Sequence, residues 1–93
     1  MEFEWDARKN ATNVAKHGVS FEVAKEAFDD PNAVVAFDSD HSGAGELRWW
    51  LLGMVNVRVL LVRYTHRPSG TIRIIGAGYW RTGKELYEKA QRK

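Results

Sequence analysis

Residues 57–81, VRVLLVRYTHRPSGTIRIIGAGYWR, constrain the fold more than any other part of the chain. They contain two stretches rich in apolar and β-branched residues, 57–66 and 71–77, and the turn between them holds a proline and a glycine. A third stretch of this kind, 46–53, precedes them across a two-residue turn at Val55 and Asn56. The pattern predicts three antiparallel strands around which the rest of the chain must pack.

The remaining segments alternate between helix and strand patterns. In chain order they predict a short edge strand at Phe3 and Trp5, a helix over 7–16 between Asp6 and Gly18, a helix over 21–30 after Ser20, a strand over 32–37, a loop over 38–45 and a last helix opened by Thr82 or Gly83. The predicted fold class is α+β, with two N-terminal helices packed on a small twisted antiparallel sheet and a C-terminal helix. A length of 93 residues fits a single domain, 1–93.

Charge is divided unevenly along the chain. Residues 1–62 hold six Lys/Arg and ten Asp/Glu, a net charge of −4, whereas residues 63–93 hold eight and two, a net charge of +6. A basic C-terminal third is typical of a protein that binds nucleic acid or an acidic partner, although solubility alone also accounts for it. The chain has no cysteine and no apolar run long enough for a membrane span, so we expect a cytoplasmic protein without disulfides.

Strand alternation gathers arginines on one face of the predicted sheet. With the two-residue turn above, Arg48 pairs with Arg63 and Trp50 pairs with Leu61. An odd number of residues in the turn after residue 66 brings Arg73 to the same face, and the opposite face is the better core. The residues expected to converge are Arg48, Trp50, Arg63, Arg67 and Arg73.

Two interpretations of this face remain open. Like charges opposite each other destabilise a sheet, so a bound phosphate would relieve the repulsion. Alternatively, Asp38, Asp40 and Glu46 neutralise the arginines as ion pairs.

The three histidines admit both functional and structural interpretations. His66 next to Arg67 is suited to acid–base chemistry on a phosphodiester, but it is also a typical exposed turn residue. His17, beside the capping Gly18, is more typical of a group that compensates a helix dipole. His41 ends a D-x-D-H string that is only a weak metal signal, so no metal and no cofactor are expected.

Several motifs, in their order and spacing, resemble the BrnT toxin family. They are FEWD at the start, KHGVSFEVA, FDDP, the D-x-DH loop followed by Glu46 and Arg48, YT-x-R at 64–67 and RII at 73–75. The resemblance implies a bacterial ribonuclease toxin of a type II toxin–antitoxin system with a fold similar to the RelE group. It also implies neutralisation by a BrnA-type ribbon-helix-helix antitoxin, through which alone the toxin contacts DNA.

The resemblance and the arginine face together suggest metal-independent RNA cleavage by attack of the ribose 2′-hydroxyl on phosphorus. We expect His66 to transfer protons, and Arg67, Arg73 and Arg81 to bind the phosphate. The residues expected to bind the RNA strand are Arg48, Trp50, Arg63, Tyr79 and Lys84.

The match to the family ends after RII. The family continues with Ser-Ala-Arg, whereas this chain has Gly76, Ala77 and Gly78. Arg81 is expected to supply the lost charge. The alternative is a basic binding module without nuclease activity that holds RNA or the antitoxin, and a third interpretation is an autorepressive partner of the antitoxin.

Overall fold

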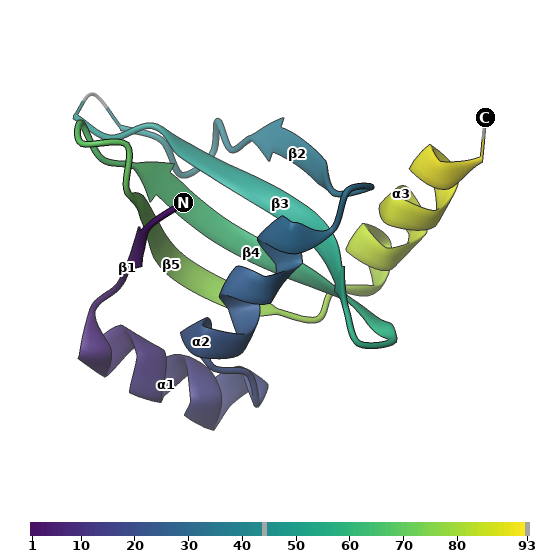
Figure 1. Cartoon of the computed structure of the whole chain (residues 1–93), viewed down its shortest axis with the longest axis horizontal. Coiled ribbons are helices and arrows are strands. Elements are labelled where there is room, and N and C mark those ends of the chain that lie inside the picture. Colours follow the sequence, from purple (N-terminus) through teal and green to yellow (C-terminus); the bar gives the residue numbers. More distant parts are fainter. Residues whose placement is uncertain (44, 93) are drawn as a thin grey trace.

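The computed structural model describes residues 1–43 and 45–92, and they form a five-stranded sheet with helices on both faces (Figure 1). The elements are β1 (Phe3–Glu4), α1 (Ala7–His17), α2 (Phe21–Ala24), the 3-10 helix η1 (Lys25–Asp29), β2 (Val34–Phe37), β3 (Arg48–Val55), β4 (Arg58–His66), β5 (Ile72–Gly78) and α3 (Arg81–Gln91). None of the helices in this described part combines the length and the apolar character of a membrane span.

The α+β class is confirmed, but the sheet differs from the prediction. Its strand order is β1-β5-β4-β3-β2, and β1 runs parallel to β5, so the sheet is mixed rather than antiparallel. The first strand has only two residues, which are too few for the sequence to predict which strand it pairs with or whether the pairing is parallel. The predicted second helix is also different, because only its first turn is α-helical and the rest is the 3-10 helix η1.

Capping residues set the ends of the N-terminal helices. The Asp6 side chain accepts hydrogen bonds from the backbone N–H groups of Arg8 and Lys9, at 2.8 and 3.2 Å. Gly18 ends α1 in the left-handed conformation at φ 71°, which a glycine adopts without strain. The predicted caps of α1 are therefore confirmed.

The main core lies between one face of the sheet and the segment from α2 to η1, which crosses that face in Figure 1. Phe21, Ala24 and Ala27 are fully buried there against Val62 and Ile74. Burial of a side chain such as Phe21 contributes about 2 to 3 kcal/mol. Sequence alternation assigned the core to this face of the sheet, and the structure confirms it.

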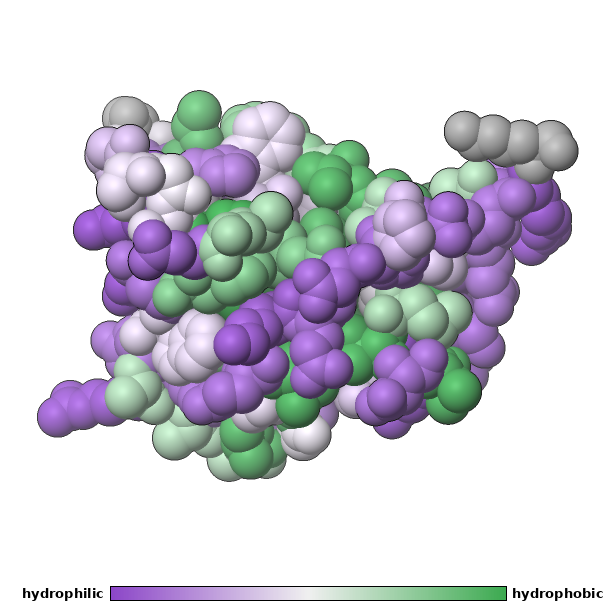
Figure 2. Space-filling model, in the orientation of Figure 1, coloured by the Kyte–Doolittle hydropathy of each residue, from purple (hydrophilic) through white to green (hydrophobic). Residues whose placement is uncertain are grey.

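The other face of the sheet is covered only at one end, by α3. Leu52 and Val59 pack there against Tyr87. The Tyr87 hydroxyl donates a 2.6 Å hydrogen bond to Asp30, which joins α3 to the segment after η1. Figure 2 shows hydrophilic residues over most of the visible surface of α3. The rest of this face of the sheet is left open to form a pocket.

Candidate active site

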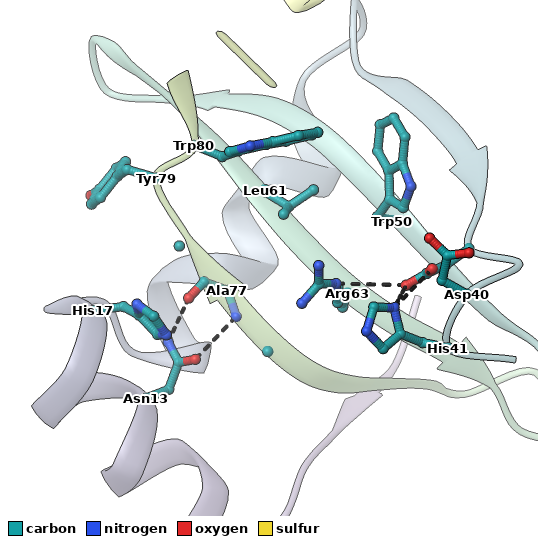
Figure 3. A pocket seen from close by; sticks show the side chains of 13 residues that line it. Asn13, His17, Asp40, His41, Trp50, Leu61, Arg63, Ala77, Tyr79 and Trp80 are labelled. Carbon is teal, nitrogen blue, oxygen red and sulfur yellow. Dashed lines mark hydrogen bonds and ion pairs between the residues drawn. The ribbon is translucent and has the colours of Figure 1, made fainter. Parts of the chain in front are cut away.

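A pocket of about 440 Å³ lies on the open face of β3, β4 and β5 (Figure 3). Trp50 and Leu61 lie on its floor, Asp38 and His41 form one wall, and His17 lies on the wall across the pocket. The walls therefore come from the loop after β2 and from the C-terminal end of α1.

A carboxylate, an imidazole and a guanidinium meet at the first wall. The His41 Nδ1 atom lies 2.9 Å from Asp38 Oδ2, and the Arg63 Nε atom lies 3.6 Å from the same oxygen. The side chain of Asp38 is only 7% exposed, whereas those of His41 and Arg63 are 48% and 45% exposed. The buried carboxylate thus holds two groups that face the pocket.

The charge state of Asp38 fixes the orientation of His41. Burial acts to raise the pKa of the Asp38 carboxyl, but the hydrogen bond from His41 and the charges of His41 and Arg63 outweigh it, so the pKa lies below its usual value. An ionised carboxylate only accepts hydrogen bonds, so the His41 Nδ1–H must be the donor. The bonds to Asp38 use only Nδ1, so the His41 Nε2 atom is the ring nitrogen left for a ligand.

Asn13 positions the opposite wall. Its amide nitrogen donates to the carbonyls of Val19 and Ala77, at 2.8 and 2.9 Å, and its amide oxygen accepts from the Ala77 N–H at 3.2 Å. Asn13 is 8% exposed, and these bonds satisfy its amide inside the protein. They fix α1 against β5 and with it His17, one turn further along the helix.

A β-bulge in β5 shapes the floor of the pocket. Tyr64 pairs with Ile74, but Arg63 pairs with Gly76, so Ile75 is the extra residue. The bulge reverses the alternation that follows, so Ala77 enters the core, and Gly76 and Gly78 face the pocket. A Cβ atom at Gly78 would lie 3.6 Å from His17 Cγ, and one at Gly76 would have no neighbour within 4 Å. The two glycines that depart from the expected Ser-Ala-Arg pattern therefore both line the pocket.

The arginines expected to form an anion site share one face, but three of them form ion pairs with carboxylates there. Arg48 lies 2.7 Å from Glu46, and Arg73 and Arg67 lie 2.7 and 3.4 Å from Glu4. The ion-pair interpretation therefore applies to these three residues, although Glu4 was not among the expected partners. Of the predicted arginines on this face, only Arg63 lines the pocket.

His66 does not lie beside the arginines, which corrects the expected arrangement. Strand alternation turns it to the other face, where its ring packs edge-on against Tyr64 at a centroid distance of 5.5 Å. Tyr64 belongs to the main core. His66 is thus separated from the pocket by the sheet.

The other predicted site residues lie in or next to the pocket. Trp50 and Tyr79 line it, and the Trp50 ring meets the Trp80 ring edge-on at 6.3 Å. Arg81 and Lys84 instead line a second groove, of about 320 Å³, to which Tyr79 and Trp80 also belong. Apart from His66, the predicted residues are therefore divided between two adjoining grooves and the ion-paired surface of Arg48, Arg67 and Arg73.

Sequence reasoning placed His17 and His41 outside the candidate site. The i, i+3 spacing of Asp38 and His41 is a signal of the pair that the structure shows, because a short loop brings such residues together. No local signal marks His17, since its approach to the pocket depends on the long-range bonds of Asn13. Among the described residues, no group of three or more His, Asp or Glu side chains is arranged to hold a metal ion.

Comparison with known proteins agrees with the motifs. The family described as "ribonuclease toxin, BrnT, of type II toxin-antitoxin system" matches residues 5–84. The crystal structure of the Brucella abortus ribonuclease toxin BrnT, at 1.1 Å resolution, is similar with a TM-score of 0.65 and 28% identity, over 84% of this chain and 94% of that chain. No curated protein matches the sequence. The family match confirms the resemblance seen in the sequence, and the chain belongs to the BrnT family of type II toxin–antitoxin ribonuclease toxins.

Proposed function

We propose that this protein is an endoribonuclease that cleaves RNA without a metal ion, and that the pocket between His17 and His41 is its active site. The observation that carries the proposal is the His41 imidazole, oriented by a buried carboxylate and placed beside Arg63 at the pocket wall. This combination provides a proton-transfer group and a fixed positive charge in the same cavity.

His41 is the proposed proton-transfer group. The 2′-hydroxyl of a bound ribose loses its proton to His41 Nε2 as its oxygen attacks the adjacent phosphorus. Asp38 stabilises the imidazolium that forms, because its ionised carboxylate accepts the Nδ1–H at 2.9 Å. The bond from phosphorus to the 5′-oxygen then breaks, and the leaving oxygen takes up a proton.

His17 is the proposed donor of that proton. It lies across the pocket from His41, as Figure 3 shows, which suits an acid and a base acting on opposite sides of one phosphate. A Cβ atom at Gly78 would lie 3.6 Å from His17 Cγ, so the His17 ring borders the pocket floor beside this glycine. The reaction requires His41 to be unprotonated and His17 to be protonated at the start. At the end His41 carries the proton from the 2′-hydroxyl, and His17 has given its proton to the 5′-oxygen.

Arg63 is the proposed phosphate ligand. Its guanidinium is always charged and binds two phosphate oxygens at once. Its Nε atom lies 3.6 Å from Asp38, beyond hydrogen-bond distance, and its side chain is 45% exposed. In this proposal Arg63 takes the place first given to Arg67 and Arg73, which share the Glu4 carboxylate as an ion-pair partner.

Cleavage in the presence of a chelator tests the proposal. Purified protein mixed with single-stranded RNA and excess EDTA is expected to release fragments that end in a 2′,3′-cyclic phosphate or a 2′- or 3′-phosphate. Folded protein that leaves the RNA intact contradicts the proposal, and so does cleavage that begins only when magnesium is added.

The family also supports a protein partner. Membership of a toxin–antitoxin family implies an antitoxin and an RNA target. We propose that the antitoxin is of the BrnA ribbon-helix-helix type, and that the toxin contacts DNA only through it. A fold of the RelE group and a cytoplasmic location complete this proposal.

The open floor at Gly76 and Gly78 favours a second candidate, an RNA-binding module that has lost cleavage. Restoring the family residues in a Gly76→Ser, Gly78→Arg variant separates the two functions. If the lost side chains stabilised the transition state, the cleavage rate rises by about tenfold or more, because one such contact typically contributes 10²- to 10³-fold. Initial rates on the same RNA measure the effect.

A Val35→Arg variant is the control for added charge. Val35 is 51% exposed and pairs with Leu51, so its side chain lies on the other face of the sheet. An equal increase with both variants would attribute the gain to charge alone. An unchanged rate in the double variant would mean that these two positions do not limit cleavage.

A further inference from the structure

The second groove differs from the arginine surface in its charge balance. Its described lining includes Arg58, Arg81 and Lys84, a single acidic residue, Glu88, and the rings of Tyr79 and Trp80. No carboxylate of the described residues lies within 4.0 Å of these three cations. Arg48, Arg67 and Arg73, by contrast, all have carboxylate partners. This groove therefore holds positive charge that no ion pair in the described part of the chain compensates.

Arg58 is oriented by an aromatic ring instead of a carboxylate. Its guanidinium carbon lies 3.5 Å from the centroid of the Tyr79 ring. A cation–π contact of this kind fixes the plane of the guanidinium but does not neutralise its charge. The edge of the guanidinium, with its N–H groups, stays available to a phosphate.

The two grooves adjoin each other. Tyr79 and Trp80 line both of them, and the Trp80 ring also meets Trp50 inside the pocket. A chain that leaves the pocket over these rings enters the second groove. Cations and aromatic rings together along such a path are typical of single-stranded nucleic acid sites, where the cations bind phosphates and the rings stack on bases.

We propose that the second groove is a subsite for single-stranded RNA, in which Arg58 and Lys84 bind a phosphate that flanks the cleaved one and Trp80 stacks on the neighbouring base. The subsite deepens the proposed ribonuclease function and depends on it for its substrate class. An acidic peptide would satisfy the cations, but it has no flat base to stack on Trp80, so the rings favour RNA.

Binding of an uncleavable RNA tests the subsite separately from catalysis. The probe is a fluorescent eight-nucleotide RNA with 2′-O-methyl groups, measured by anisotropy over a range of salt concentrations. Arg58→Ala and Lys84→Ala are each expected to raise Kd by roughly threefold to tenfold and to lower the salt slope by about one, since each removes about one phosphate contact. Trp80→Ala is expected to raise Kd without changing the slope.

Lys25→Ala is the matched control, because Lys25 is an exposed cation on η1. It is expected to keep the Kd of the unchanged protein. If Arg58→Ala and Lys84→Ala behave like this control while EDTA-resistant cleavage occurs, the subsite is wrong and the proposed function stands. If the variants weaken binding but the protein cuts no RNA, the proposed function is wrong and the groove still binds RNA. Tighter binding of a glutamate-rich peptide than of the RNA would overturn the choice of ligand.

Discussion

A His41→Gln variant is expected to cleave RNA about 10² to 10⁴ times more slowly than the unchanged protein, the usual contribution of a positioned general acid or base. Glutamine keeps a polar side chain of similar reach but does not exchange a proton near neutral pH. His41 is 48% exposed and lies in a loop, so the variant should keep its fold. Initial rates in excess EDTA measure the loss, and a thermal melt checks the fold.

His66→Gln is the matched control for His41→Gln. It makes the same chemical change on the other face of the sheet, where His66 packs against Tyr64. We expect it to retain the rate of the unchanged protein. The opposite outcome, in which His66→Gln loses activity and His41→Gln keeps it, would reject the pocket and restore the site first predicted from the sequence.

Strand alternation predicted the faces of the sheet even where the turn was misplaced. Val55 and Asn56 were the expected loop, but Val55 pairs with Arg58 and the loop is Asn56 and Val57. Arg48 consequently pairs with Thr65, two residues from the expected partner. A shift of two residues preserves every side-chain direction, so the prediction of the arginine face survives.

The misplaced turn has a local cause. Val57 is β-branched and apolar, which favours a strand, yet it is 89% exposed in the turn. Asn56 adopts φ 57°, a left-handed conformation that asparagine tolerates better than most residues. Here the conformational preference of Asn56 decided the position of the turn more than the strand preference of Val57 did.

An odd number of residues in the turn after β4 was the condition for bringing Arg73 to the arginine face, and the structure meets it, but the bulge that follows was not expected. His66 pairs with Ile72, so five residues separate them and Arg73 joins the arginine face. Without the bulge at Ile75, alternation would send Gly76 and Gly78 to the core face. Nothing in the apolar run RII marks the extra residue, so the floor of the pocket was not predictable from strand alternation.

The ion-pair partner of Arg73 and the position of His17 depend on contacts between residues that are far apart in the sequence. Glu4 and Arg73 are separated by 69 positions and meet only because β1 pairs with β5. Asn13 and Ala77, which bring His17 to the pocket, are separated by 64 positions. Because the partner of the short strand β1 was not predictable, Glu4 was not recognised as the partner of Arg67 and Arg73.

A Gly53→Ala variant is expected to lose about 2 to 3 kcal/mol of unfolding free energy, a large part of the stability of a small domain. Gly53 of β3 lies directly against Ala27 of η1, and a Cβ atom there would be 2.4 Å from the carbonyl oxygen of Ala27. That oxygen belongs to the backbone and cannot swing aside as a flexible side chain can. The neighbouring Met54 N–H also donates to Asp30 at 2.7 Å, so displacement of either segment would strain this bond.

Gly76→Ala is the control for Gly53→Ala. It also replaces a strand glycine, but at a position without a close backbone contact such as that between Gly53 and Ala27. Both glycines lie in the described sheet at ordinary φ values, but a Cβ atom at Gly76 meets nothing within 4 Å. We expect Gly76→Ala to keep or slightly raise stability, because alanine reduces the entropy of the unfolded chain. Urea unfolding followed by tryptophan fluorescence measures both variants. Equal stability of the two variants would mean that the segment after α2 moves away from β3 at little cost, and that the core is not held by the contact between Ala27 and Gly53.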